Sequence, residues 1–536
     1  MTFGRLRTSL RTAAVLVRAG VVRLERPDKL VRVGVTMLRW GPTPAAGYRI
    51  STIRTPRRAA IHDELGTITF AEIDAATNAL AHGLRELGVA EGDAIAVLCR
   101  DHRGFIEVSV AASKLGATLL LLNTSFAAPQ IADVCAREKP RAIIFDEEFT
   151  ELCRPASEGR IALVAWQESP RPAHRTLAEL IAAGDRSALR PPRDRGRVVI
   201  LTSGTTGAPK GASRHQPRSL DPAAALFSRL PLRAREGTLI ASPLFHSWGY
   251  AHYTLGLALS STLVLRRRFD PQETLAAIAQ WRPSALVAVP VMLTRILDLG
   301  PEAIARHDTS SLRVIAVSGS ALPGELALRL MDTFGEHLYN LYGSTEVAWA
   351  TIASPDQLRA APGTAGTPPR GTQVRLFDEE DHEVTGAGRH GRIFVGNEMV
   401  MDGYTSGDRR TTIAGLIATG DVGYFDTHGR LFVAGRDDDM IISGGENVFP
   451  REVEDLLAEH PAIDDVAVIG VPDEQFGERL RAFVVLHDGA TLSEQEVRDH
   501  VRENLARFKA PRDVVFLDVL PRNATGKVLK RDLRAR

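Results

Sequence analysis

The chain has 536 residues, of which 44% are hydrophobic and 24% charged, and its 66 basic side chains nearly balance its 65 acidic ones. This length predicts two to four domains with substantial cores, and the balanced charge argues against a dedicated nucleic-acid binder. No stretch approaches the ~18–20 uninterrupted apolar residues that a membrane-spanning helix needs. The three cysteines have no metal-ligand or redox spacing, which favours a reducing compartment and a cytoplasmic location.

The basic residues are unusual in kind, because 59 are arginine and only seven are lysine. Arginine can take over most surface roles of lysine, but it cannot replace lysine as a compact point charge. The positions of the surviving lysines are therefore informative. They are Lys29, Lys114, Lys139, Lys210, Lys509, Lys527 and Lys530.

The N-terminal stretch is rich in arginine and poor in acidic residues. Spacings of four and seven place Arg7, Arg11, Arg18, Glu25 and Arg32 on one helical face. Such a basic amphipathic helix can lie on an anionic membrane surface, or it can be an ordinary helix packed on the body of the protein. We assign residues 1–49 to an N-terminal basic helical extension, for which peripheral contact with the inner membrane surface stays open.

From residue 69 onward, apolar strands alternate with amphipathic helices, which predicts parallel sheets covered by helices. Residues 158–197 are rich in Pro, Arg and Ala and are interpreted as a surface connection. Helices are expected at 69–87 and 105–115. Strands are expected at 94–98, 118–122, 142–145, 198–201, 262–265, 285–289 and 314–317.

Residues 372–434 contain short alternating runs separated by Gly and Asp turns, which predicts a small β-barrel or sheet. The last part of the chain predicts a separate small domain, with helices at 450–458 and 494–505 and strands at 466–469 and 481–486. The expected fold is α/β. It has a large domain (50–436) of parallel-sheet α/β subdomains plus a small β-barrel, and a small mobile α+β domain (437–536).

The strand at 198–201 runs directly into a loop rich in glycine and hydroxyl groups. Successive N–H groups beside glycines can form a concave nest for phosphate oxygens, and a lysine at the end adds a point charge. A Walker-type loop is disfavoured, because the spacing is wrong, Pro209 precedes the lysine and Gly211 follows it. The loop residues expected to bind phosphate are Thr202, Ser203, Gly204, Thr205, Thr206, Gly207 and Lys210.

This loop closely resembles the signature loop of the adenylate-forming superfamily, which includes acyl-CoA synthetases, aryl-CoA ligases, luciferases and adenylation domains. The resemblance covers roughly residues 50–536 and is strongest to fatty acyl-CoA synthetases. It also rests on segments that occur in the expected order: Leu341–Glu346, Thr419–Asp421, Gly435–Arg436, Ser443–Asn447 and Pro521–Lys527.

The resemblance implies the roles of several residues around ATP. Asp421 would accept hydrogen bonds from the ribose hydroxyls, and Arg436 would support the ribose or the phosphates. Glu346, assisted by Thr202, would bind Mg²⁺. The two walls of the adenine slot would be Gly319, Ser320 and Ala321 on one side and Tyr342, Gly343, Ser344 and Thr345 on the other.

The segment Pro243–Tyr250 resembles the family segment between the acid pocket and the α-phosphate. His246 would orient the carboxylate or gate its access, although a buried structural histidine is an open alternative. The candidate walls of the acyl pocket are bulky and apolar, which suits an aliphatic or aryl acid. They are His246, Trp248, Tyr250, Val291, Val347 and Trp349.

The resemblance further implies a two-step reaction that uses ATP, Mg²⁺ and CoA. Lys527 would stabilise the transition state in which the acid attacks ATP. The C-terminal domain would then rotate about Asp438, so that Ser443, Gly444, Gly445 and Glu446 line a channel for CoA. We expect a ligase for medium- to long-chain fatty acids. An aryl-CoA ligase and an acyl-adenylate ligase that loads a carrier protein are the alternatives.

Overall fold

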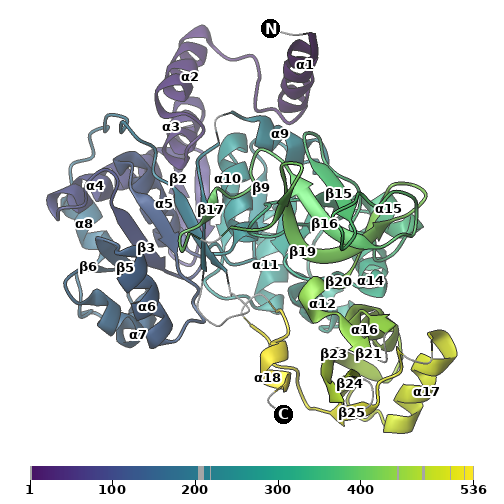
Figure 1. Ribbon diagram of the computed structural model, residues 1–536. Helices are drawn as coiled ribbons and strands as arrows, with labels where there is room; N and C mark the ends of the chain where they lie inside the picture. The colour runs from purple at the N-terminus through teal and green to yellow at the C-terminus, as the bar shows by residue number, and fades with distance from the viewer. Residues whose placement is uncertain are drawn as a thin grey trace.

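The computed structural model describes residues 3–202, 210–217, 219–407, 409–443, 446–473, 477–506, 509–523 and 526–534. Two large sheets with covering helices form the body of the molecule, as Figure 1 shows. The helices α1 and α2 lie at one end of this body, and the C-terminal domain lies at the other. None of the helices in the described residues is long and apolar enough to cross a membrane.

The first sheet has eight strands and is parallel except at its two ends, where β13 pairs with β14 and β1 pairs with β2 in antiparallel fashion. Its central strands are fully buried apolar runs, as expected of strands covered on both faces. In sheet order, the strands are β14 (Thr351–Ala353), β13 (Leu338–Tyr342), β12 (Val314–Val317), β11 (Ala285–Ala288), β9 (Gly237–Ile240), β10 (Thr262–Leu265), β1 (Ala59–Asp63) and β2 (Gly66–Thr69).

The second sheet has seven strands, with its parallel part between β7 and β6. One prediction was wrong here. Residues 158–197 are not only a surface connection, because they contain the edge strand β6 and the helix α8, which packs on α4. In sheet order, the strands are β17 (Gly403–Tyr404), β8 (Lys210–Arg214), β7 (Val198–Thr202), β4 (Thr118–Leu121), β3 (Ala94–Leu98), β5 (Ala142–Phe145) and β6 (Ile161–Val164).

The two sheets share one continuous core, which contains side chains of α3, α4, α5 and α10 as well as of both sheets. The helix α4 starts at a capping box, in which Thr69 and Glu72 satisfy each other's backbone N–H groups. The helices are α3 (Pro44–Arg54), α4 (Phe70–Glu86), α5 (Arg103–Leu115), α6 (Ala128–Glu138), α7 (Thr150–Ser157), α8 (Leu177–Ala183), α9 (Asp221–Phe227), α10 (Ser247–Leu259), α11 (Pro271–Trp281), α12 (Pro290–Leu297), α13 (Pro301–Ala305), α14 (Gly324–Phe334) and α15 (Pro355–Ala360), with a 3₁₀ turn at Glu147–Phe149.

A third, antiparallel sheet stands where a small barrel or sheet was predicted. Among the described residues, no pairing joins its outer strands, so it is an open sheet and not a barrel. The long strand β19 has β16 on one side and both β18 and β20 on the other. The strands are β15 (Gln373–Phe377), β16 (Gly391–Gly396), β18 (Thr412–Ile413), β19 (Leu416–Phe425) and β20 (Leu431–Arg436).

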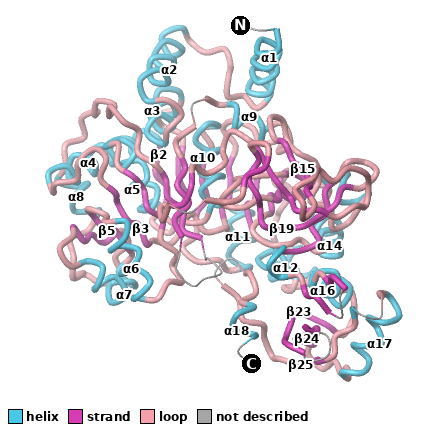
Figure 2. The backbone as a smooth tube through the Cα atoms, viewed as in Figure 1, coloured by secondary structure: helices cyan, strands magenta, loops and turns pink. Residues whose placement is uncertain are grey.

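The C-terminal domain is a fourth sheet with helices packed against it, and Figure 2 shows its strands grouped below the body of the molecule. The short 3₁₀ helix Asp437–Asp439 leads into it. The predicted helix at 450–458 is confirmed. The elements are β21 (Ile441–Ser443), β22 (Glu446–Val448), α16 (Pro450–Ala458), β23 (Ile463–Asp473), β24 (Gly477–Leu486), α17 (Glu494–Asn504), β25 (Asp513–Phe516) and α18 (Lys530–Arg534).

The N-terminal residues form two helices, α1 (Phe3–Arg18) and α2 (Pro27–Trp40), rather than one. The predicted single basic face is therefore wrong, because Glu25 lies between the helices. Its carboxylate pairs there with Arg54 at 3.3 Å and Arg235 at 3.1 Å. The next helix, α3, crosses residue 49, where we placed the end of the extension, and it packs into the main core.

Candidate active site

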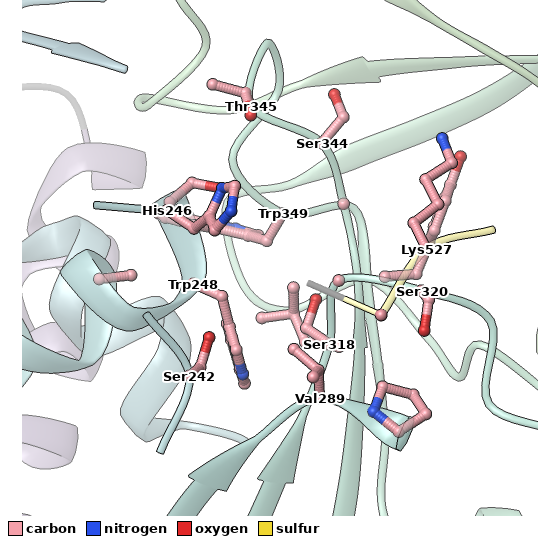
Figure 3. Close-up of a pocket in the computed structure, with 18 of the residues that line it drawn as sticks. Ser242, His246, Trp248, Val289, Ser318, Ser320, Ser344, Thr345, Trp349 and Lys527 are labelled. Atoms are coloured by element: carbon pink, nitrogen blue, oxygen red, sulfur yellow. The ribbon is translucent and has the colours of Figure 1, made fainter. Parts of the chain in front are cut away.

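One large cavity of about 2560 Å³ lies between the large domain and the C-terminal domain. Most of the predicted site residues that lie within the described part of the chain line this cavity. In Figure 3, Lys527 lies beside Ser320 on one side of this pocket, and Trp248 and Ser242 lie across from it. The predicted residues that line it are Lys210, His246, Trp248, Tyr250, Val291, Gly319, Ser320, Ala321, Tyr342, Gly343, Ser344, Thr345, Glu346, Trp349, Asp421, Arg436 and Lys527.

At one end of the cavity, Tyr342, Asp421 and Arg436 form a connected group. The Tyr342 hydroxyl donates a hydrogen bond to Asp421 Oδ2 at 2.5 Å. Asp421 and Arg436 are opposite each other in the β19–β20 pairing, with 3.8 Å between Arg436 Nη1 and Asp421 Oδ1. Burial, followed by the negative charge of Asp421, raises the pKa of Tyr342 well above its usual value, so the phenol stays protonated. This arrangement presents a carboxylate and a cation to a polar ligand.

Gly343 is required by a close backbone approach. A Cβ atom at this position would lie 2.3 Å from the carbonyl oxygen of Ala348, which is shorter than any real contact. In the structure, the space beside this glycine is taken by the turn that returns the chain from β13 to β14.

Glu346 is buried and held by groups that the sequence analysis missed. Its Oε1 atom accepts hydrogen bonds from the Tyr404 hydroxyl at 2.6 Å and from Arg410 at 3.3 Å. Burial alone would raise the pKa of Glu346, but the hydrogen bonds from Tyr404 and Ser344 and the charge of Arg410 outweigh it and lower the pKa. The carboxylate is therefore ionised, which fits a hard oxygen ligand for Mg²⁺.

Two further basic side chains contact the neighbours of this carboxylate. Lys210 Nζ lies 5.7 Å from the centre of the Tyr404 ring, and Arg214 donates to the Thr345 carbonyl at 2.6 Å. The tyrosine belongs to β17, which pairs with β8, the strand that begins at Lys210. The available sequence signal was the basic pair Arg409 and Arg410 shortly after this tyrosine, and both arginines line the cavity.

Part of the predicted phosphate loop lies outside the described residues, namely Ser203, Gly204, Thr205, Thr206 and Gly207. Its two ends are fixed by the pairing of β7 with β8, in which Thr202 stands opposite Lys210. The loop therefore starts and ends at the same point of the sheet edge, and Lys210 lines the cavity.

The wall of the cavity next to the segment Pro243–Tyr250 carries two unpaired polar atoms. Within the described part of the chain, Ser242 Oγ and His246 Nε2 are buried and have no hydrogen-bond partner. Burial lowers the pKa of His246 to about 4, so the imidazole is neutral at pH 7. Two buried polar atoms without a protein partner at a cavity wall fit a polar ligand group.

The apolar wall contains all but one of the side chains predicted for it. The Trp248 indole donates to the Ala288 carbonyl at 3.1 Å, and that of Trp349 donates to Thr372 Oγ1 at 2.9 Å, so both rings are held in place. The prediction that Val347 lines the acyl pocket was wrong. This residue is fully buried in the core of the third sheet and does not line the cavity, because the turn after β13 directs it away.

The loop that carries Lys527 is pressed against this wall. Gly526 has a positive φ of 77°, and a Cβ atom there would lie 2.1 Å from Val291 Cγ1. The loop is closed by reciprocal bonds, in which Lys527 N donates to Asn523 Oδ1 and Asn523 N donates to the Lys527 carbonyl, each at 2.9 Å. Lys527 is thus placed in the same cavity as His246 and Asp421.

The predicted hinge and CoA loop lie elsewhere in the C-terminal domain. Asp438 is the middle residue of the 3₁₀ helix between the domains. Ser443 and Glu446 face each other across the β21–β22 pairing. Gly444 and Gly445 fall outside the described residues.

Comparison with known proteins agrees with this geometry. The profile of the family described as AMP-binding enzyme matches residues 50–405, and that of the AMP-binding enzyme C-terminal domain matches residues 452–527. A feruloyl-CoA synthase from Amycolatopsis sp. is 34% identical over 92% of this chain and 98% of its own. The long-chain-fatty-acid–CoA ligase FadD13 of Mycobacterium tuberculosis is 31% identical over 87% of this chain and 92% of its own.

Among solved structures, the o-succinylbenzoate CoA synthetase of Bacillus subtilis in complex with its acyl-adenylate intermediate superposes with a TM-score of 0.80. The two chains are 28% identical, and the match covers 91% of this chain and 97% of that one. Because the first profile alone spans more than half of the sequence, the chain belongs to the AMP-binding enzyme family of the adenylate-forming superfamily, as an AMP-forming acid–thiol ligase that uses ATP, Mg²⁺ and CoA.

Proposed function

We propose that this ligase activates a medium- to long-chain fatty acid. The acid's carboxylate attacks the α-phosphorus of ATP, pyrophosphate leaves, and the acyl-adenylate then transfers its acyl group to the thiol of CoA. The observation that carries the choice of substrate is the shape of the cavity. It continues from Lys527 and His246 along Tyr250, Thr254 and Ala258 of α10 toward α3, where its lining is apolar.

In the first step, the Lys527 ammonium contacts both reactants and balances the charge that collects between them. Asp421 and Arg436 hold the ribose, and the walls at 319–321 and 342–345 hold the adenine. Glu346 and Thr202 hold Mg²⁺, which when bound neutralises phosphate charge. His246 is neutral and binds the substrate carboxylate through Nε2–H, and this proposal is supported by its unpaired Nε2 atom.

In the second step, residues 437–536 rotate as one domain about Asp438 relative to residues 50–436. This removes Lys527 from the cavity and brings Ser443, Gly444, Gly445 and Glu446 to the adenylate, where they line the path of the CoA thiol. The separation of the two loops supports the rotation, because Lys527 already occupies the cavity while Ser443 and Glu446 lie in the β21–β22 hairpin.

An aryl acid is the second candidate substrate. The indoles of Trp248 and Trp349 line the cavity, and flat rings stack well on such side chains. The relatives named above act on feruloyl, o-succinylbenzoyl and long-chain fatty substrates according to their names. Transfer to a carrier protein instead of CoA is the corresponding alternative for the second step.

Release of pyrophosphate that depends on an added acid tests the proposal. The panel includes acids from acetate to oleate together with benzoate and ferulate, each with and without CoA. We expect the highest kcat/KM for the longer fatty acids and acyl-CoA as the product. A preference for ferulate or benzoate would favour the aryl alternative, and no acid-dependent release would contradict the proposal.

We also propose that the enzyme works in the cytoplasm, at the inner surface of the membrane. Its three cysteines are free and buried, which suits a reducing compartment. The membrane contact is supported by the composition of the N-terminal helices.

A further inference from the structure

Exposed apolar side chains are concentrated near the N-terminus. Of the twelve large hydrophobic residues that are exposed among those described, seven lie between residues 17 and 38. Single exposed apolar residues are common on soluble proteins, but a contiguous group marks a contact surface. They are Val17, Val22, Leu24, Leu30, Val31, Val35 and Leu38.

The helix α2 has apolar side chains on two faces. Its inner face packs on α3, with Trp40 buried against Ala46 and Ile50. Its outer face carries Val31, Val35 and Leu38, which are 65%, 46% and 84% exposed. Spacings of four and three place these residues on one stripe. Because the inner face already makes the packing contacts, the described fold does not use the outer stripe.

The surrounding charge is strongly positive. Residues 1–54 contain eleven basic and two acidic residues, a formal charge of +9, whereas the rest of the chain carries −8. Arg32 and Arg39 of α2 are both exposed beside the apolar stripe. An apolar stripe flanked by arginines is the composition of a helix that lies in the interface of an anionic membrane.

The same helix stands at the far end of the cavity. Val33 and Met37, on the inner side of α2, line the cavity together with Pro42 and Ile50. The C-terminal domain lies at the opposite end of the molecule in Figure 1. A membrane that contacts α2 would therefore be far from the rotating domain and next to the apolar end of the cavity.

We propose that the outer face of α2 docks on a bilayer that contains anionic phospholipid, and that the acid enters the cavity from that bilayer. The inference rests on the proposed function, because it supplies the route by which an insoluble acid reaches the site. The stripe enters the acyl region, and the flanking arginines bind the phosphate groups. Residues 1–49 precede the region that the family profile matches, so this surface belongs to the extension of this chain.

The test is sedimentation of the full-length protein with vesicles of phosphatidylglycerol and phosphatidylcholine, or of phosphatidylcholine alone. We expect binding to the anionic vesicles that weakens at high ionic strength. The double variant Val31→Asp/Leu38→Asp should bind at least about tenfold more weakly. The matched control is Leu65→Asp, because Leu65 is 62% exposed in a turn outside the extension, and its binding should equal that of the unmodified protein.

A second variant, Arg32→Ala/Arg39→Ala, keeps the apolar stripe and should lose the preference for anionic vesicles. Failure of the unmodified protein to bind, or binding of both double variants equal to that of the unmodified protein, would overturn the proposal. A dimer in solution that dissociates in Val31→Asp/Leu38→Asp, without vesicle binding by the unmodified protein, would assign the stripe to a second copy of the chain. Pyrophosphate release with a soluble short acid, measured on the same samples, tests the proposed function separately.

Discussion

Lys114 explains why one lysine persists in a chain that otherwise uses arginine. Its side chain lies buried between α4 and α5, and Nζ donates to Asp74 Oδ1 at 2.7 Å, Thr77 Oγ1 at 2.8 Å and Asn78 Oδ1 at 2.7 Å. A compact ammonium can make these contacts within one small space, whereas the planar fork of arginine cannot. No role for Lys114 could be predicted from the sequence, because its partners are 36 to 40 positions away.

Lys527, like Lys114, should be a position at which arginine cannot replace lysine. We predict that Lys527→Ala slows adenylate formation by about 100-fold or more, while thioester formation from supplied acyl-adenylate survives. Lys527→Arg should also lose most adenylation activity, because a larger planar group replaces a point charge. Pyrophosphate release and single-turnover thioester formation measure the two steps. Lys139→Arg, at an exposed lysine, is the matched control, and equal loss of both steps in Lys527→Ala would contradict the assignment.

His252 should make stability depend on pH. Burial lowers the pKa of this α10 residue to about 4, below its ordinary value of 6.5, so the fold favours the neutral ring. Its stabilising effect is therefore complete above pH 6.5 and is lost as the pH falls from 6.5 toward 4. Between pH 6.5 and pH 5, the loss amounts to about 2 kcal/mol.

The variant His252→Asn removes this titration while its amide can still donate to the Trp248 carbonyl, as Nδ1 does at 3.2 Å. Thermal unfolding midpoints measured from pH 7 to pH 5 should fall less steeply in the variant than in the unmodified protein. Parallel curves for the two proteins would show that His252 does not carry the effect.

Prediction of single residues from the sequence succeeded where a motif fixed the backbone. It failed where a turn determined the direction in which a side chain points. Tyr342, Asp421 and Lys527 line the cavity as expected. Val347, only one residue after Glu346, points into a core instead. Tyr404 and Arg410 were missed because they reach Glu346 through pairing of β17 with β8, about 190 positions away in the chain.

At the scale of elements, the loop that carries Lys527 docks through Gly526. We predict that Gly526→Ala slows adenylate formation by at least about tenfold, because a methyl group at 2.1 Å from Val291 Cγ1 must push the loop out of the cavity. Thioester formation from supplied acyl-adenylate should be affected less. Kinetics of both half-reactions provide the measurement.

The double variant Gly526→Ala/Val291→Ala is the internal control for this contact. It should recover part of the lost adenylation rate, because the smaller side chain makes room for the methyl group, while the cost of the positive φ at residue 526 remains. No recovery in the double variant would indicate that the backbone conformation, and not the contact, causes the loss.

The 3₁₀ helix Asp437–Asp439 provides the second prediction at this scale. Asp438→Pro fixes φ at a residue where a large rotation needs it to change. We expect acid-dependent pyrophosphate release to continue and thioester formation to fall to a small fraction. Unchanged overall turnover in this variant would show that the rotation occurs elsewhere.

The elements themselves were predicted well wherever apolar periodicity was strong. The strands at 94–98, 142–145, 262–265 and 314–317 are confirmed at the predicted residues. The segment 158–197 was predicted as a surface connection because it is rich in Pro and Arg. It nevertheless contains a four-residue edge strand and a seven-residue helix. The break between α1 and α2 was not predicted, because periodicity alone does not show where a helix ends.

For the whole molecule, the sequence predicted the fold class but not the contacts between distant parts of the chain. The third sheet was expected as a barrel or a sheet, and only the strand pairing decides between them. The position of the C-terminal domain depends on contacts between distant residues, such as the stacked rings of His390 and Phe449, whose centroids lie 6.0 Å apart, and the approach of Gly526 to Val291. Such pairings leave no periodic signal in the sequence.

The position of Arg436 has a consequence for the order in which products leave. It is the last residue of β20, lies beside Asp421, and is followed directly by the 3₁₀ helix at the hinge. A nucleotide bound by Asp421 and Arg436 would stabilise the end of β20, which stays in place next to the hinge while the C-terminal domain rotates. AMP is part of both the adenylate and the final product, so it should remain in place while the domain turns. We therefore expect pyrophosphate to depart before the rotation and AMP to depart only after the acyl group has been transferred.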